Sequence, residues 1–393
     1  MRTCLVVVLL VFFISVYTSS AQTLEEPLRN VLKLELVFGA ENLPDEFLLA
    51  NPGELSVDDA GNIYVIDEKR VKVFDKNGKA IDIFSGPGRG PGEFIGQVGT
   101  ISISQTGYIS VHNGGVFNSR GYNIYDSNYK FLKISHKNKY TMMGFHSGYS
   151  AKIYTFGEDE YVGVSKESYT EDDLIKTSEK LEFYKGDIKH EIAAYDKLEA
   201  VVTKDMNLGI NYNGRFLWDY LPDKSIIYSH SRLDAVFTPE KSYQKLHIID
   251  LQNNEKKILE HSFEPRIIEI KEYREFDRST SRQMREILNQ VTTRKEAYER
   301  MHDILRSFKY ADYLRRIFAD GNIVFIVTTE KNDNEEVLVD VLDCEKMVYL
   351  TSVYFPPKTN FRKIKNGFAY KIGESDGFPV VQKYRIDPAV YGK

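Results

Sequence analysis

A unit of four strand-like segments recurs through the chain, and this recurrence limits the fold more than any other feature. In its clearest copy, residues 55–94, alternating β-branched and aromatic residues predict strands at 55–57, 63–66, 71–74 and 80–84. Asn and Gly residues between these segments supply the positive φ angles of tight turns. One such sheet cannot bury both of its faces alone, so copies of it must stack.

The spacing of the turns identifies the kind of stack. Gly61 and Gly107 lie 46 residues apart, and Gly321 and Gly367 are separated by the same interval. Two weaker turns between them, near Asp159 and Asp223, bring the number of units to six. A period of about 40–50 residues with four strands is typical of a propeller blade. The sequence therefore predicts an all-β fold, a six-bladed β-propeller with four strands per blade.

The two ends of the chain predict how the ring closes. Outer hairpins are expected at 122–132, 181–192, 245–259 and 337–350, but the sixth unit has only one outer strand, at 380–386. A lone strand at 31–39 precedes the first complete unit. We expect this strand to complete the last blade and so to hide sheet edges that an open array would expose.

One segment, about 273–310 between the fourth and fifth units, is charged and has helical periodicity. Its two apolar stripes are Met284, Ile287, Leu288 and Val291, then Tyr298, Met301, Leu305 and Phe308. We predict a helical hairpin inserted between blades 4 and 5. It should lie over the face of the ring that carries the blade-to-blade connections, called the upper face below. A lid over the channel or a docking surface would use such an element, and a solvated charged face would give the same pattern.

The N-terminus predicts export. Arg2 is followed by an apolar stretch, residues 5–16, and by the small residues 19–21, which is the pattern of a cleaved signal peptide. The apolar stretch is too short for a comfortable membrane span. We therefore expect a signal peptide at 1–21, a propeller domain at 22–393, and a location in the periplasm or the extracellular space. Of the two cysteines, Cys4 leaves with the signal peptide, so Cys344 is the one thiol of the mature chain.

The charge pattern excludes one class of partner. The formal net charge is −5 and no sustained basic run occurs, so a nucleic-acid-binding surface is not indicated.

Residues 60–79 (AGNIYVIDEKRVKVFDKNGK), followed by GPGRGPGEF at 86–94, resemble the NHL-type repeat. More closely, they resemble the exported six-bladed β-propeller proteins of unknown function from Bacteroidetes-type bacteria. The resemblance implies the fold, export and a bacterial envelope setting. Related folds include calcium-dependent lactonases and zinc-dependent lyases, but their metal ligands cannot be carried over residue by residue.

GPGRGPGEF itself is not a phosphate-binding loop, because no Lys-Ser or Lys-Thr pair and no helix pattern follow it. We expect a tight blade-to-blade crossing there, with Phe94 buried between sheets. Candidate ligand-binding residues lie on loops expected near the upper face, although solvated loop residues would give the same pattern. They are Glu68, Arg70, Arg89, His112, Asn113, Arg120, His230 and Arg232.

These features favour an exported module of the bacterial envelope that binds a ligand or a protein, with a glycan or another envelope protein as partner. The alternative is a metal-dependent hydrolase or lyase that acts on a small molecule or a sugar polymer at the upper face. That enzyme needs at least three side chains converging within about 2–2.6 Å of one metal position. No histidine pair has metal-ligand spacing, and no catalytic or metal residue is assigned. No cofactor is required, calcium remains open as a ligand, and the oligomeric state is open.

Overall fold

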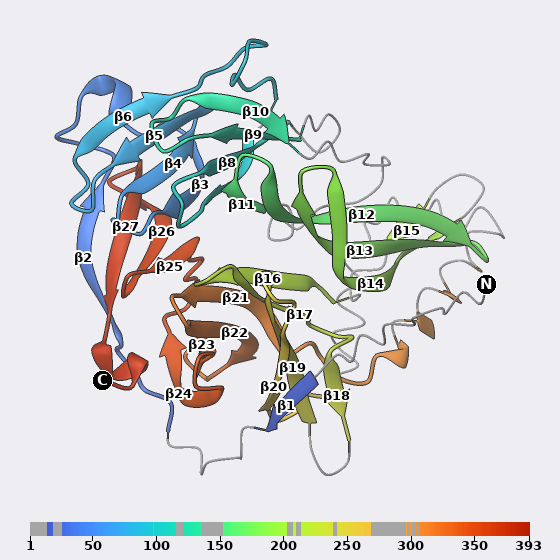
Figure 1. Ribbon diagram of the computed structural model, residues 1–393. Coiled ribbons are helices and arrows are strands. Elements are labelled where there is room, and N and C mark those ends of the chain that lie inside the picture. The colour runs from blue at the N-terminus through green and yellow to red at the C-terminus, as the bar shows by residue number, and fades with distance from the viewer. Residues whose placement is uncertain are drawn as a thin grey trace, which may run out of the picture.

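Six mainly antiparallel sheets form a closed ring of blades (Figure 1). In this computed structural model, the described residues are 14–18, 26–96, 98–114, 121–135, 152–202, 207–209, 214–238, 242–268, 296, 299–300, 303–304, 306–307 and 308–393. The predicted all-β, six-bladed propeller is confirmed, with the four-stranded core of blades 1 to 5 running outward from the centre of the ring in chain order.

Blades 1 and 2 match the predicted units closely. Blade 1 consists of β3 (Pro52–Val57), β4 (Ile63–Asp67), β5 (Arg70–Phe74) and β6 (Ala80–Phe84). Blade 2 consists of β7 (Val98–Ile103), β8 (Ile109–Asn113), β9 (Gly121–Tyr125) and β10 (Phe131–Ser135). The turn glycines that define the repeat have positive φ, +88° at Gly61 and +82° at Gly107, which side chains with a Cβ atom rarely adopt.

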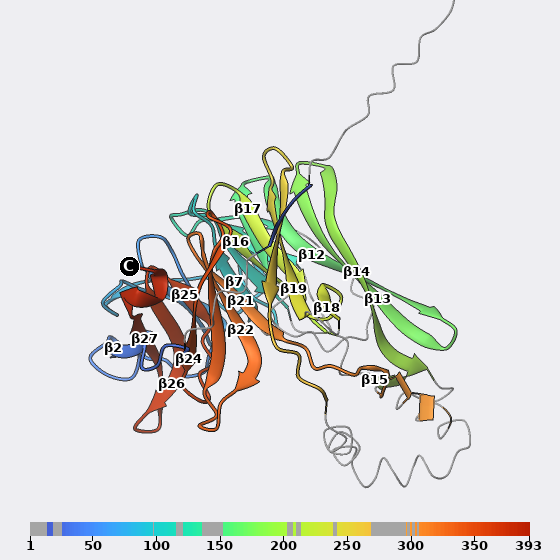
Figure 2. The ribbon, with the colours of Figure 1, turned by 90° about the horizontal axis from the view of Figure 1, so that it is seen from below.

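Blade 3 departs from the repeat by its length. It consists of β11 (Ile153–Gly157), β12 (Glu160–Glu171), β13 (Leu174–Lys185), β14 (Ile188–Val202) and the short β15 (Asn207–Gly209). Its β12, β13 and β14 extend past the neighbouring blades (Figure 2). The strands continue because β12 and β13 pair along their whole length without a register shift.

Blade 4 carries additions at its edge. Its core is β16 (Phe216–Leu221), β17 (Ser225–His230), β19 (Ser242–Asp250) and β20 (Lys256–Ser262), with β18 (Ala235–Phe237) paired to β19. Outside β20, β1 (Ile14–Thr18) pairs as a parallel strand. This strand lies within the predicted signal peptide, which remains a prediction.

The last two blades confirm the predicted closure. Blade 5 consists of β21 (Leu314–Asp320), β22 (Ile323–Lys331), β23 (Val337–Asp343) and β24 (Val348–Phe355). Blade 6 consists of β25 (Lys363–Lys365), β26 (Phe368–Ser375), β27 (Phe378–Ile386) and, from the N-terminal side, β2 (Leu32–Phe38). Because β2 pairs antiparallel with β27, the beginning and the end of the domain form one sheet.

Short segments connect the strands of neighbouring blades. The 3-10 helices η1 (Asp45–Phe47) and η2 (Pro388–Tyr391) lie after β2 and β27. The predicted blade crossing at 86–94 is confirmed: Phe94 is fully buried, and its N–H donates to the Gly86 carbonyl at 2.8 Å. The predicted helical hairpin at 273–310 lies almost wholly outside the described residues. Helical backbone is described there only at 296, 299–300, 303–304 and 306–307.

Apolar clusters between neighbouring blades hold the ring together. Between blades 6 and 1, for example, Phe38 of β2 and Tyr370 of β26 share one cluster with Leu55 and Phe74. Between blades 4 and 5, Cys344 packs with Leu246 and Leu342. Comparable apolar clusters fill the other blade interfaces, so neighbouring blades pack closely against each other. This close packing makes the walls of the channel at the centre of the ring rigid.

Candidate ligand site in the central channel

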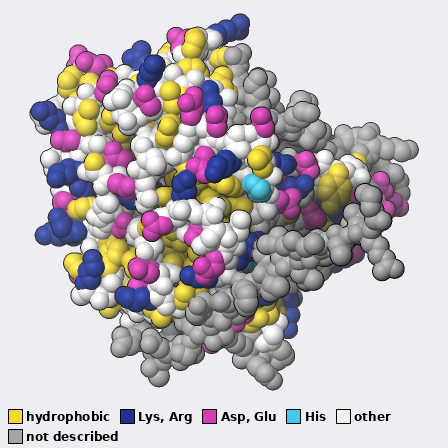
Figure 3. Space-filling view, viewed as in Figure 1, with side chains coloured by type: hydrophobic (Ala, Val, Ile, Leu, Met, Phe, Trp, Pro, Cys, Tyr) yellow, Lys and Arg dark blue, Asp and Glu magenta, His cyan; other side chains and the backbone are white. Residues whose placement is uncertain are grey.

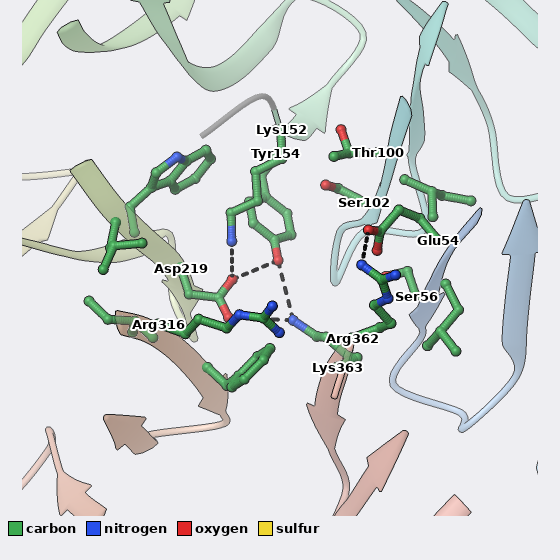
Figure 4. A pocket seen from close by; sticks show the side chains of 16 residues that line it. Glu54, Ser56, Thr100, Ser102, Lys152, Tyr154, Asp219, Arg316, Arg362 and Lys363 are labelled. Atoms are coloured by element: carbon green, nitrogen blue, oxygen red, sulfur yellow. Dashed lines mark hydrogen bonds and ion pairs between the residues drawn. The ribbon is translucent and has the colours of Figure 1, made fainter. Parts of the chain in front are cut away.

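The channel widens into a cavity of about 80 Å³ lined by the innermost strand of every blade. The polar side chains that line it are Glu54, Ser56, Thr100, Ser102, Lys152, Tyr154, Asp219, Arg316, Arg362 and Lys363 (Figure 4). Lys152 precedes β11 and Lys363 begins β25, whereas Ser56 and Ser102 are the last residues but one of β3 and β7, so the cavity lies along the innermost strands and not at one of their ends. Ligand binding was expected at the upper face, where the blade-to-blade connections reach the first residues of the innermost strands, and that placement stays a prediction.

Asp219 of β16 is the centre of one half of the site. Its Oδ1 accepts hydrogen bonds from Lys152 Nζ and from the Tyr154 hydroxyl, both at 2.9 Å. Its Oδ2 accepts the Ala319 N–H at 2.9 Å and lies 3.5 Å from Lys363 Nζ. Burial alone would raise the pKa of Asp219, but Lys152, Lys363 and the Ala319 N–H hold it well below its usual range. This carboxylate is therefore ionised and shared by two lysines.

Glu54 of β3 and two arginines form the other half. Arg362 Nη1 lies 2.6 Å from Glu54 Oε1. Arg316 Nη1 donates to the Phe361 carbonyl at 2.8 Å, and its Nη2 donates to Asn360 Oδ1 at 2.5 Å. Burial and the charge of Arg362 lower the pKa of Arg316 to about 10, although Glu54 opposes this shift. Arg316 is therefore still charged near neutral pH.

Positive charge is in excess in this cavity. Among the described residues that line it, four are cationic, Lys152, Arg316, Arg362 and Lys363, while two are carboxylates, Glu54 and Asp219. Burial lowers the pKa of Lys152, and the Lys363 charge adds to this effect while Asp219 opposes it. On the described part of the face seen in Figure 3, by contrast, acidic and basic side chains are interspersed. The local excess is a feature of the channel.

None of the predicted site residues that the structure describes lines this cavity. Glu68, with a φ of +48°, forms the β4–β5 turn, and Arg70 begins β5 as an exposed residue. Arg89 is exposed in the crossing between β6 and β7. Arg120 lies outside the described residues.

Two of the predicted residues in blade 2 lie together at the end of β8. Asn113 is buried; its Oδ1 accepts the Ile95 N–H at 3.2 Å and its Nδ2 donates to the Glu93 carbonyl at 2.9 Å. His112 is half-buried, and its ring centroid lies 5.2 Å from that of Tyr122. Asn113 thus fastens the blade crossing to blade 2.

His230 and Arg232 hold the end of β17. His230 is fully buried, and its Nδ1 accepts the backbone N–H groups of Arg232 at 3.2 Å and Leu233 at 3.0 Å. Burial lowers the pKa of His230 to about 4, so the ring is neutral with its proton on Nε2. Arg232 Nη2 lies 2.6 Å from Asp312 Oδ1 and donates to the Tyr310 carbonyl at 3.2 Å. His230 therefore stabilises the turn after β17, and Arg232 joins this turn to the chain leading into blade 5.

Two further observations concern reactive groups. Within the described ranges, no three His, Cys, Asp or Glu side chains group closely enough to hold a metal ion. Cys344 is buried in the core between blades 4 and 5, and burial raises the pKa of its thiol. The thiol is thus poorly suited to act as a nucleophile.

The sequence held a signal for the channel residues that the prediction missed. Counting back five residues from the turn glycines Gly61, Gly107, Gly321 and Gly367 gives four of the lining residues. They are Ser56, Ser102, Arg316 and Arg362. A serine or an arginine five residues before a repeated turn glycine therefore marks the channel wall.

Comparisons with known proteins give structural neighbours only. No family model matches the chain, and no curated protein matches it either. The resemblance to the NHL-type repeat therefore remains a prediction. No helix among the described residues combines the length and the apolar character needed to cross a bilayer.

Solved structures similar to this chain include a putative exported protein from Bacteroides fragilis, with 12% identity and a TM-score of 0.47. That similarity covers 95% of this chain and 100% of the other. Hydrazine synthase from Kuenenia stuttgartiensis is 12% identical over 84% of this chain and 82% of its own, with a TM-score of 0.39. A protein of unknown function from Bacteroides caccae is 9% identical, with a TM-score of 0.33 and coverage of 77% and 81%. At these values, the similarities carry no argument about function.

Proposed function

We propose that this chain is an exported, non-catalytic binding protein whose ligand enters the central channel. The observation that carries the proposal is the convergence of ten polar side chains from all six innermost strands on one cavity. A concave site with a few converging polar groups is the usual form of a small-ligand site. The signal-peptide pattern of residues 1–21 supports export to the periplasm or the extracellular space.

The walls of the site favour binding. Trp218 and Phe318, buried beside the cavity, give it an apolar lining between the charged groups. Each lining strand is packed between its neighbouring blades, so the polar groups are held in place before the ligand arrives. Such preorganisation reduces the entropy that binding costs. The propeller fold itself names no ligand, since the same architecture serves many functions.

Thermal unfolding against a panel of sugars, short peptides and small organic acids tests the proposal. A ligand that binds only the folded state, present at a hundredfold excess over its Kd, should raise the free energy of unfolding by about 2.7 kcal/mol. In Thr100→Phe, a phenyl ring at the cavity wall should abolish this effect. Ser127→Phe, a change in the exposed turn between β9 and β10, is the matched control.

The same assay separates the competing interpretations. Equal ligand effects in Thr100→Phe and Ser127→Phe would exclude the channel as the binding site. Calcium and zinc, each with and without a chelator, address the alternative of a metal-dependent hydrolase or lyase. A stabilisation by metal that the chelator reverses, together with turnover of a panel compound, would replace the binding proposal with that enzyme.

A further inference from the structure

The two carboxylates of the channel are each outnumbered by cations. Asp219 faces Lys152 at 2.9 Å and Lys363 at 3.5 Å. Glu54 faces Arg362 at 2.6 Å, and its charge also acts on Arg316. The charged side chains of the cavity therefore form two groups of three, here called triads. Each triad has one negative and two positive side chains.

The cations converge from different parts of the ring. Lys152 comes from blade 3, Arg316 from blade 5, and Arg362 and Lys363 from the start of blade 6. Ser102 and Thr100 of blade 2 face the cavity on the side opposite Asp219 (Figure 4). The Ser102 hydroxyl group can donate a hydrogen bond to a ligand that lies between the two triads. The site thus presents donors on several sides of one small space.

This set of donors fits one ligand chemistry. Arginine presents a planar fork of N–H groups that matches carboxylate and phosphate oxygens, and lysine adds a point charge. A cleft with walls of low dielectric strengthens the field of its charges. A volume of about 80 Å³ has room for several water molecules or for one small group, so it suits the head of a ligand.

We infer that the cavity binds an oxyanion group, the carboxylate or phosphate of a larger ligand, between Arg316, Arg362 and Lys363. This inference rests on the proposed function, because it names the chemical class of the ligand for the same site. A bound carboxylate offsets one of the two excess positive charges, a phosphate group offsets up to two, and the pairs of Asp219 and Glu54 stay in place. The remainder of the ligand extends out of the cavity toward the upper face.

The protonation equilibria agree with this arrangement. Burial and a neighbouring cation lower the pKa of both Arg316 and Lys152. A further negative charge beside these two groups would therefore raise the pKa of each and stabilise its protonated form.

Calorimetric titration of the whole purified protein with inorganic phosphate, sulfate and acetate, at constant ionic strength set by chloride, tests the inference. At least one of these anions should bind saturably with a Kd of about 10 mM or less. Phosphate binding more tightly than acetate would identify a phosphate head group, and the reverse order would identify a carboxylate.

Charge variants should change the affinity in opposite directions. Lys363→Gln and Arg362→Gln each remove a donor to the anion and should raise its Kd about tenfold. Glu54→Gln removes a competing negative charge and should lower the Kd. Lys130→Gln, an exposed change of the same kind in the β9–β10 turn, should leave the Kd unchanged. Circular dichroism of each variant checks that it is folded.

The outcomes distinguish this inference from the proposed function. Failure of all three anions to bind saturably would overturn the inference. So would affinities that fall equally in Lys130→Gln and Lys363→Gln, because that result means diffuse screening at the surface. A neutral sugar or peptide whose effect is lost in Thr100→Phe, without any anion effect, would overturn the inference and leave the binding function standing.

Discussion

At the scale of single residues, His230 is a neutral buried base with a structural task. Its Nδ1 accepts two backbone N–H groups, and its ring packs against Tyr195 with centroids 5.2 Å apart. The adjacent Asp234 Oδ2 accepts the His230 N–H at 2.7 Å and the Tyr195 hydroxyl at 2.6 Å. The end of β17 therefore depends on an imidazole that must stay unprotonated.

This dependence predicts a loss of stability in acid. Burial places the pKa of His230 at about 4 in the folded protein, against 6.5 for an ordinary histidine. Between these values the unfolded chain binds the proton and the folded chain does not. The contribution is thus complete above pH 6.5 and is lost as the pH falls through about 4, by at most about 3 kcal/mol.

Urea unfolding at several pH values, on the protein and on His230→Asn, measures this contribution. Asn places an acceptor oxygen where Nδ1 stood but does not titrate, so the difference between the two proteins should shrink as the pH falls. Parallel pH profiles for the two proteins would show that His230 does not control stability in this range.

At the scale of elements, a buried ion pair fastens the loop that leads from the closing strand into blade 1. Asp67, at the end of β4, accepts the Asn51 N–H at 2.6 Å and Lys72 Nζ at 2.7 Å. Lys72 Nζ also donates to the Leu48 carbonyl at 2.5 Å. Both side chains are almost completely buried, and the loop at 48–51 depends on them for its hydrogen bonds.

Breaking the ion pair between Asp67 and Lys72 should lower the free energy of unfolding. Lys72→Met leaves the Asp67 charge buried without its cation, and we expect the free energy of unfolding to fall by about 3–5 kcal/mol. Lys331→Met breaks the exposed pair with Glu335 and should cost less than about 1 kcal/mol. Adding Asp67→Asn to Lys72→Met should recover part of the loss, because the unpaired charge is removed. Equal costs for Lys72→Met and Lys331→Met in urea unfolding would contradict this interpretation.

The sequence was informative about elements because the blade pattern is local. Gly61 and Gly107 adopt the positive φ that their turns required, and β4 begins at Ile63 as predicted. The extension of β12 to β14 was not foreseen, since nothing in a repeat specifies how far a strand continues past its blade. The channel residues were missed for the opposite reason. Asp219 and Lys363 are distant in sequence, and only ring closure brings them to 3.5 Å.

At the scale of the whole molecule, stability depends on ring closure by β2. This strand pairs with β27, and Phe38 at its end packs against Phe74 of blade 1 with ring centroids 4.8 Å apart. Arg385 Nε donates to Glu35 Oε2 across the same pair of strands at 2.6 Å. The strand therefore joins the first and last blades at once.

Truncation should expose this dependence. A chain that begins at residue 39 lacks β2 and should lose the single cooperative transition of thermal unfolding, because β27 loses its partner strand and Phe74 of blade 1 loses its contact with Phe38. A chain that begins at residue 22 keeps β2 and should unfold cooperatively. A synthetic peptide of residues 31–39 should restore the transition to the shorter chain. Cooperative unfolding of the shorter chain without the peptide would refute the closure argument.

The buried position of Cys344 has a practical consequence for studying this molecule. In the chain from residue 22, Cys344 is the only cysteine, and the core between blades 4 and 5 encloses it. A cysteine introduced on an exposed turn, such as at Asn77 or Asn128, will therefore react alone with a maleimide reagent in the folded protein. Paired fluorophores or spin labels can be placed on chosen blades without removing the native thiol, and distances across the ring become measurable by spectroscopy.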